Sequence, residues 1–165
     1  MTQLPSPRSR VAGPAARASR TGLLLLGALA AAICLAGAAE ADEPGLSIEK
    51  PWIRMSIPSR PAAGYFTLRN DSAETRALTG AQSPACGMLM LHRSVHEGGQ
   101  ERMIMVKDVP VPAHGAAIFS PGGYHLMCMS PTKAVTPGQS VPVTLKFDNG
   151  GTITASFPVR NMRGQ

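Results

Sequence analysis

Aromatic and acidic residues are scarce in this chain of 165 residues. Phe, Trp and Tyr make up 4% of it, and only ten residues are Asp or Glu. The acids are scattered among segments that read as turns, and neither a Ser-His-Asp group nor a pair of carboxylates is visible. The sequence therefore offers no hydrolytic centre of either kind.

The charge is also weak once the N-terminus is set apart. The formal net charge is +6, but four of the sixteen Lys and Arg residues precede residue 21, and one of the ten acids, Glu40, precedes residue 42. The remainder carries about +3, counted in the usual way. A positive charge this mild and this scattered does not indicate a partner among the nucleic acids.

A helical period is absent outside the N-terminal segment, and no internal repeat is present. Instead, 17 Gly and 15 Pro separate short alternating segments, which is typical of strands joined by turns. The expected strands are 46–54 (interrupted by Pro51), 64–70, 76–81, 88–95, 102–107, 116–120, 124–129, 141–147 and 152–157. Eight or nine short strands in a chain of one-domain length predict an all-β sandwich or small barrel.

Only one long apolar run occurs, at residues 23–39, after a basic segment without acids. A basic segment, an apolar segment and then small residues are the form of a secretory signal peptide. Ala39-Glu40-Ala41 fits the cleavage rule, so we expect a signal peptide at 1–41 and a mature domain at 42–165, with its core at about 46–158. No twin-Arg pair is present. Cys34 lies inside the apolar run, without the neighbouring positions that a bacterial lipid-anchor site needs. The mature protein is expected to be periplasmic and not membrane-spanning.

Cysteine is rare, and only Cys86 and Cys128 follow the predicted cleavage point. An oxidising compartment would allow a disulfide between them. In regular strands, however, Cys86 shares a face with His92, while Cys128 opposes His125, so the two thiols leave on different faces. We therefore expect no disulfide, unless a bulge at Gly87 changes the parity.

Methionine, by contrast, is concentrated in the middle of the chain. In the segments 88–92 and 124–129, His and Met alternate with apolar residues, and residues two apart on a strand share a face. Each strand thus presents an imidazole and thioethers on one side. If the two faces converge, they form a site for a soft metal ion, and this donor set favours monovalent copper.

The spacing of four residues is specific. His92 is followed by ten residues and then Met103, and 21 residues later come His125 and, after Leu126, Met127. This pattern resembles the H(M)-x10-M-x21-H-x-M signature of the periplasmic copper chaperones of the PCu(A)C family. Other segments are similar to that family too, namely Trp52, 63–70, 111–113 and 121–127.

The resemblance implies a cupredoxin-like, Greek-key β-sandwich with an exposed Cu(I) site. The ligands carried over by position are His92, Met103, His125 and Met127. It also implies a chaperone rather than an enzyme, delivering Cu(I) toward the dinuclear copper site of cytochrome c oxidase. The implied partners are subunit II of that oxidase or a thioredoxin-like copper-insertion protein.

This chain departs from the family pattern in two places. Arg93 stands where the optional Met would follow the first His, and the C-terminus lacks a tail rich in His and Met. A second site for Cu(II) is therefore not indicated. Met90 and Met129 share the ligand face and are candidates for neighbouring or reserve ligands. We expect Met88 and Met105 to pack in the core, and His96 and His114 to lie on the surface.

Four other functions remain as alternatives. A scavenging or copper-resistance protein would use the same four residues. A blue-copper carrier needs a Cys ligand with His and then Met downstream, which neither Cys86 nor Cys128 offers. A copper oxygenase with an N-terminal His ligand is not indicated, because Asp42 or Glu43 stands at the expected mature start. A β-sandwich interaction domain without metal would leave the His and Met spacing unexplained.

Overall fold

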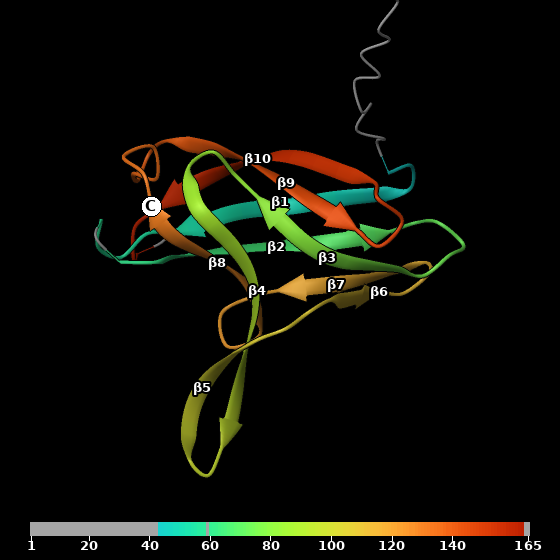
Figure 1. Cartoon of the computed structure of the whole chain (residues 1–165), viewed down its shortest axis with the longest axis horizontal. Coiled ribbons are helices and arrows are strands. Elements are labelled where there is room, and N and C mark those ends of the chain that lie inside the picture. Colours follow the sequence, from blue (N-terminus) through green and yellow to red (C-terminus); the bar gives the residue numbers. More distant parts are fainter. Residues whose placement is uncertain (1–42, 59, 164–165) are drawn as a thin grey trace, which may run out of the picture. The chain divides into compact units, whose positions relative to one another are not determined.

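The alternating segments form ten strands in a computed structural model that describes residues 43–58 and 60–163. The predicted signal peptide lies outside the described residues. The strands are β1 Leu46–Arg54, β2 Ala62–Asn70, β3 Arg76–Gln82, β4 Cys86–Glu97, β5 Gln100–Met105, β6 Val109–Val111, β7 Gly115–Phe119, β8 Tyr124–Pro131, β9 Ser140–Phe147 and β10 Thr152–Arg160 (Figure 1). No helix among the described residues has the length and apolar character needed to span a membrane.

The strands form one sheet that folds back on itself. Its order is β5-β4-β8-β7-β2-β1-β10-β9-β3-β6, with additional pairings of β4 with β3 and of β8 with β2. The β4–β3 pairing joins strands from opposite ends of this order, so the sheet encloses its apolar face as a barrel-like sandwich. The predicted all-β sandwich is confirmed, with ten strands in place of eight or nine.

Alternation along the strands directs one set of side chains into a single core. Leu68, Leu126 and Phe157 are fully buried there, and Phe66 stacks on Phe119 with ring centroids 4.3 Å apart. Each buried side chain of this size contributes roughly 1.5–3 kcal/mol relative to exposure. This core fixes the inner faces of β4 and β8, and so determines which of their residues face outward.

The strand that sequence reasoning did not predict is β6. Pro110 and Pro112 indicated a break in the chain, but Val109–Val111 pairs with β3, with Pro110 opposite Ala77. Proline lacks the N–H that a central strand must donate, but an edge strand tolerates it, and β6 ends the strand order. Its two valines are buried, so the segment is held by packing on both sides of the proline.

The irregularity expected at Pro51 is present. The β1–β2 register shifts between Glu49 and Trp52, and Lys50 adopts φ 50°. A left-handed residue in the strand reverses the local alternation. Beyond it, Trp52 is half-buried beside Tyr65, with ring centroids 4.8 Å apart.

The expectation that Cys86 and Cys128 stay apart is wrong. They form a disulfide with Cα atoms 5.4 Å apart, and both residues are buried. The register between β4 and β8 is continuous, so no residue is inserted; Ser130, next to the pair, instead adopts φ 47°. Opposite it, a Cβ on Gly87 would lie 3.1 Å from the Ser130 Cβ. This twisted end of the ladder turns Cys86 inward, which the parity of a regular strand does not predict.

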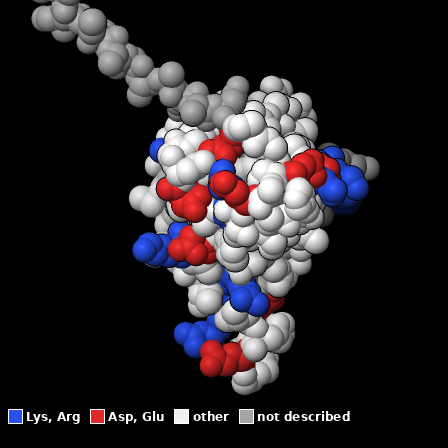
Figure 2. Space-filling model, turned by 90° about the vertical axis from the view of Figure 1, so that its right-hand side faces the viewer, with Lys and Arg blue, Asp and Glu red and all other residues white. Residues whose placement is uncertain are grey.

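Charged side chains are distributed as small pairs of opposite sign. Figure 2 shows blue and red groups next to each other on a mostly uncharged face. The ion pairs include Arg69 with Asp71, Arg76 with Glu74, and Arg102 with Glu97. This pattern agrees with the scattered, mild charge of the sequence.

Candidate metal centre

The alternating His and Met residues of β4 and β8 lie on one face of the sheet. The two strands pair antiparallel, and residues directly opposite each other in such a pair share a face. On the face away from the core, the opposing pairs are Met88 with Met129, Met90 with Met127, and His92 with His125, although His125 is itself covered and buried. The intervening pairs are Leu89 with Cys128 and Leu91 with Leu126, which belong to the core or pack on it. The two strand faces that carry His and Met therefore lie side by side on one side of the sheet.

The two imidazoles are neighbours across the strand pair. Their ring centroids are 5.8 Å apart, and the ring planes meet at 71°. The His125 side chain is buried, and its Nδ1 lies 3.1 Å from the carbonyl oxygen of Gly123. Only a protonated ring nitrogen can donate to a carbonyl, so Nδ1–H donates there and Nε2 keeps its lone pair. Histidines that bind metals are commonly oriented by such a second hydrogen bond.

His92 is half-buried, and its environment favours the neutral ring. Its Nδ1 is buried without a hydrogen-bond partner, and it is the one such side-chain nitrogen or oxygen among the described residues. Leaving a buried polar atom unpaired costs about 1–3 kcal/mol. Burial lowers the pKa of His92 from 6.5, and repulsion from His125 lowers it further. A neutral imidazole with an unpaired buried nitrogen is suited to coordinate a metal.

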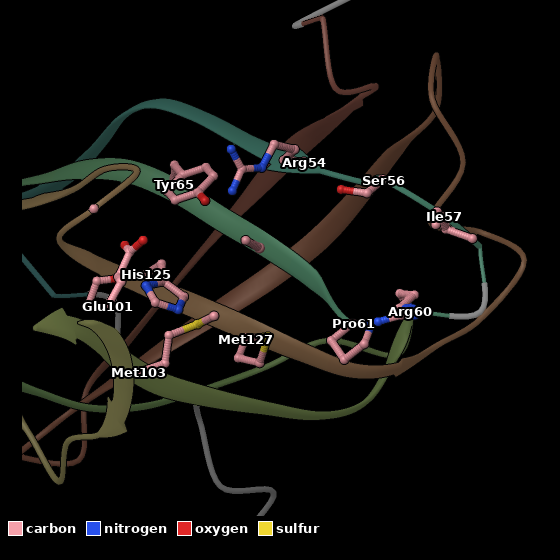
Figure 3. Close-up of a pocket in the computed structure, with 13 residues that line it drawn as sticks. Arg54, Ser56, Ile57, Arg60, Pro61, Tyr65, Glu101, Met103, His125 and Met127 are labelled. Atoms are coloured by element: carbon pink, nitrogen blue, oxygen red, sulfur yellow. The ribbon is translucent and has the colours of Figure 1, made fainter. Parts of the chain in front are cut away.

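Thioethers adjoin the imidazoles from two strands. Met127 follows His125 by two residues on β8 and is half-buried, while Met103 lies on β5 opposite Ser94 and is 61% exposed. Figure 3 shows the Met103 side chain extending toward the His125 ring, with Met127 beside them. Met103, His125 and Met127 line one cavity of about 600 Å³. His92 is not part of that lining, and joins the group through its contact with His125.

The donor set limits which ions can bind. No three side chains of the His, Cys, Asp and Glu types gather into a possible metal site within the part of the chain that the structure describes. The soft donors that line the cavity with His125 are the thioethers of Met103 and Met127. Thioethers and imidazoles suit a soft monovalent ion better than a hard divalent one.

Comparison with known proteins agrees with this architecture. A family model described as "Putative lipoprotein LpqE-like" matches residues 46–159. The chain belongs to the LpqE-like family. It is also 30% identical over 152 residues to "Putative lipoprotein Lxx21020" of Leifsonia xyli subsp. xyli, covering 90% of this chain and 91% of the relative.

Solved structures similar to this LpqE-like protein include PCuAC domains. The solution structure of CuI-DR1885 from Deinococcus radiodurans is 32% identical, with a TM-score of 0.58 over 76% of this chain and 83% of the other. The copper-bound PCuAC domain from PmoF2 is 21% identical, with a TM-score of 0.58 over 71% of this chain and 93% of the other. The predicted resemblance to the PCu(A)C family and the predicted fold are thus confirmed.

Two methionines of this LpqE-like protein are placed differently from our prediction. Met88 and Met105 were expected to pack in the core, but they are 58% and 71% exposed. Met105 lies directly opposite His92 in the β4–β5 pairing. The signal that could have found it is the Gly98-Gly99 turn, where both residues have positive φ. A hairpin with a two-residue loop fixes the register of the two strands that it joins.

Aromatic and arginine side chains lie beside the imidazoles. The Tyr65 and His125 ring centroids are 6.5 Å apart, and the Arg54 guanidinium lies 5.4 Å from the Tyr65 ring centroid. Burial raises the pKa of Tyr65, and the charge of Arg54 and its hydrogen bond partly offset this effect. Arg160 lies 5.4 Å from the Trp52 ring centroid in the same way. His96 and His114, predicted to be surface residues, are both exposed.

Proposed function

We propose that this protein is an exported copper chaperone, periplasmic in a bacterium with two membranes. It binds Cu(I) through His92, Met103, His125 and Met127. The observation that carries the proposal is the facing pair of imidazoles from β4 and β8, beside a cavity lined by the two methionines. The membership of the LpqE-like family and the similarity to the solution structure of CuI-DR1885 support it. Both favour a metal carrier over an enzyme.

The imidazole and thioether ligands have different roles in binding and releasing Cu(I). A thioether has no proton to lose, so it binds Cu(I) at any pH, and it holds the ion less tightly than a thiolate does. The imidazole of His125 is held by its hydrogen bond to Gly123, and that of His92 is partly buried. The two rings therefore provide the rigid, preorganised part of the site. Met103 is exposed on a hairpin strand, where it can be exchanged first for a ligand of the acceptor.

The disulfide argues against a blue-copper electron carrier. Such a site needs a cysteine thiolate, and both cysteines of the mature domain are joined to each other in the core. Copper at the two imidazoles therefore receives no thiolate from Cys86 or Cys128. We infer a carrier of Cu(I) rather than a site that cycles between two oxidation states.

The acceptor is proposed to be the dinuclear copper site of cytochrome c oxidase, reached through subunit II or a thioredoxin-like insertion protein. A scavenging function uses the same four residues and differs only in the fate of the bound copper. Mixing the Cu(I)-loaded protein with the apo soluble domain of subunit II separates the two functions. Copper that moves to the acceptor, read by its absorption spectrum, supports delivery, and copper that stays bound supports scavenging.

A competition titration tests the ligand set. Against a coloured Cu(I) chelator, His92→Ala and His125→Ala should each weaken Cu(I) binding by at least about tenfold, since even loss of a supporting hydrogen bond costs that much at metal sites. His96→Ala is the matched control, because His96 is on the same strand but exposed. Equal affinity of all four proteins would refute the proposal.

A further inference from the structure

The face of β4 and β8 that carries His and Met continues beyond the four proposed ligands. Past the His92–His125 pair, the next two outward pairs are Met90 with Met127 and Met88 with Met129. The chain therefore places four thioethers in two adjacent rungs, of which only Met127 is used by the proposed copper site. Met88, Met90 and Met129 remain without a role in that site.

Burial places these three methionines on the accessible side of the sheet. Met88 is 58% exposed, and Met90 and Met129 are half-buried, while their neighbours Leu91 and Cys128 are buried. Methionines that belonged to the core would occupy the inward positions that Leu91 and Cys128 hold instead. The three thioethers therefore lie on the face away from the core, with Met88 exposed and the other two partly accessible, rather than among the fully buried core residues.

The register brings the three sulfur-bearing side chains within reach of one ion. Directly opposite residues have Cβ atoms about 4.5–5.5 Å apart, and diagonal neighbours are still within reach of long side chains. Met88 and Met129 are directly opposite, and Met90 is diagonal to Met129. The disulfide between Cys86 and Cys128 crosses the same two strands on the inner face, which holds this end of the ladder in register.

We propose that Met88, Met90 and Met129 form a second, thioether-only site for a soft monovalent metal ion, Cu(I) or Ag(I). An uncharged thioether set has no attraction for hard divalent cations, and it binds soft ions without releasing protons. The Met90–Met127 rung connects this site to the imidazole site. An ion can then pass between the two by exchanging one thioether at a time.

The test is a titration of the purified protein with Ag(I), followed by the NMR signals of methionines carrying ¹³C in the methyl group. The proposal expects two equivalents to bind, one shifting Met103 and Met127 and the other shifting Met88, Met90 and Met129. The double variant Met88→Leu/Met129→Leu should weaken the second equivalent by about tenfold or more and leave the first unchanged. Leucine keeps the apolar surface and removes only the sulfur.

Two further variants keep the outcomes distinct. Met162→Leu removes an exposed methionine elsewhere in the chain and should leave both equivalents intact. His92→Ala/His125→Ala should abolish the first equivalent and keep the second, so failure of the imidazole site does not hide the thioether site. A single equivalent in the wild-type protein, or a second equivalent that persists in Met88→Leu/Met129→Leu, would overturn the proposal.

Discussion

Removing the Cys86–Cys128 disulfide should cost this domain a large part of its stability without removing its metal site. The two cysteines are 42 residues apart in the sequence. Cross-linking a loop of that length restricts the unfolded chain by about 4 kcal/mol in the chain-entropy model. For a domain of roughly 120 residues, that loss lowers the melting temperature by about 15 °C.

The assay is thermal unfolding by circular dichroism of the oxidised protein, the reduced protein and the Cys86→Ala/Cys128→Ala variant. The variant should melt below the reduced protein, because both cysteines are buried and alanine leaves a cavity. Cu(I) affinity at 25 °C should change by less than about threefold, since the β4–β8 ladder still holds the ligands. A melting temperature that falls by less than about 3 °C would refute the stability argument. A folded variant that loses Cu(I) binding would refute the exclusion of the cysteines from the site.

Three further predictions concern the proposed ligands. Burial and repulsion from His125 lower the pKa of His92, so protons should compete with Cu(I) for this ring only below the ordinary histidine pKa of about 6.5. Isothermal titration between pH 7 and pH 5 should therefore show the Cu(I) affinity falling toward pH 5. A constant affinity over this range would contradict imidazole ligation. His92→Ala and His125→Ala should each flatten that pH dependence, whereas His96→Ala should retain it, and a steep dependence in both ligand variants would place the titrating group elsewhere. Met103→Ala should weaken Cu(I) binding more than Met105→Ala in the chelator competition, because Met103 lines the cavity with His125, and the opposite order would assign the β5 ligand to Met105.

Much of the candidate site could be predicted because period-2 alternation is a local property. The residues that share a face within 88–92 and within 124–129 follow from this alternation, and the structure places both sets on one side of the β4–β8 pair. Which residue lies opposite which depends on the register, and alternation alone does not fix the register. The core follows for the same reason, since the intervening leucines face inward. The turn at Gly98-Gly99 could also be predicted, although the exposed position of Met105 beyond it was not.

The features that could not be predicted depend on backbone conformation at single residues. Ser130 adopts a left-handed conformation that is uncommon for a residue with a Cβ, and it turns the end of the ladder so that Cys86 meets Cys128. Neither the serine nor its neighbours in the sequence indicate this conformation. Likewise, β6 pairs around Pro110 because it lies at an edge, and the position of a strand in a sheet is decided by the whole topology.

The central claim is that two imidazoles and two thioethers from three strands bind one Cu(I) ion. X-ray absorption at the copper edge of the reduced protein, loaded with one equivalent, counts the neighbours of that ion directly. The account predicts two nitrogen and two sulfur neighbours, with one nitrogen lost in His125→Ala and one sulfur lost in Met127→Ala. A first shell of oxygen and nitrogen alone, unchanged by either substitution, would contradict it.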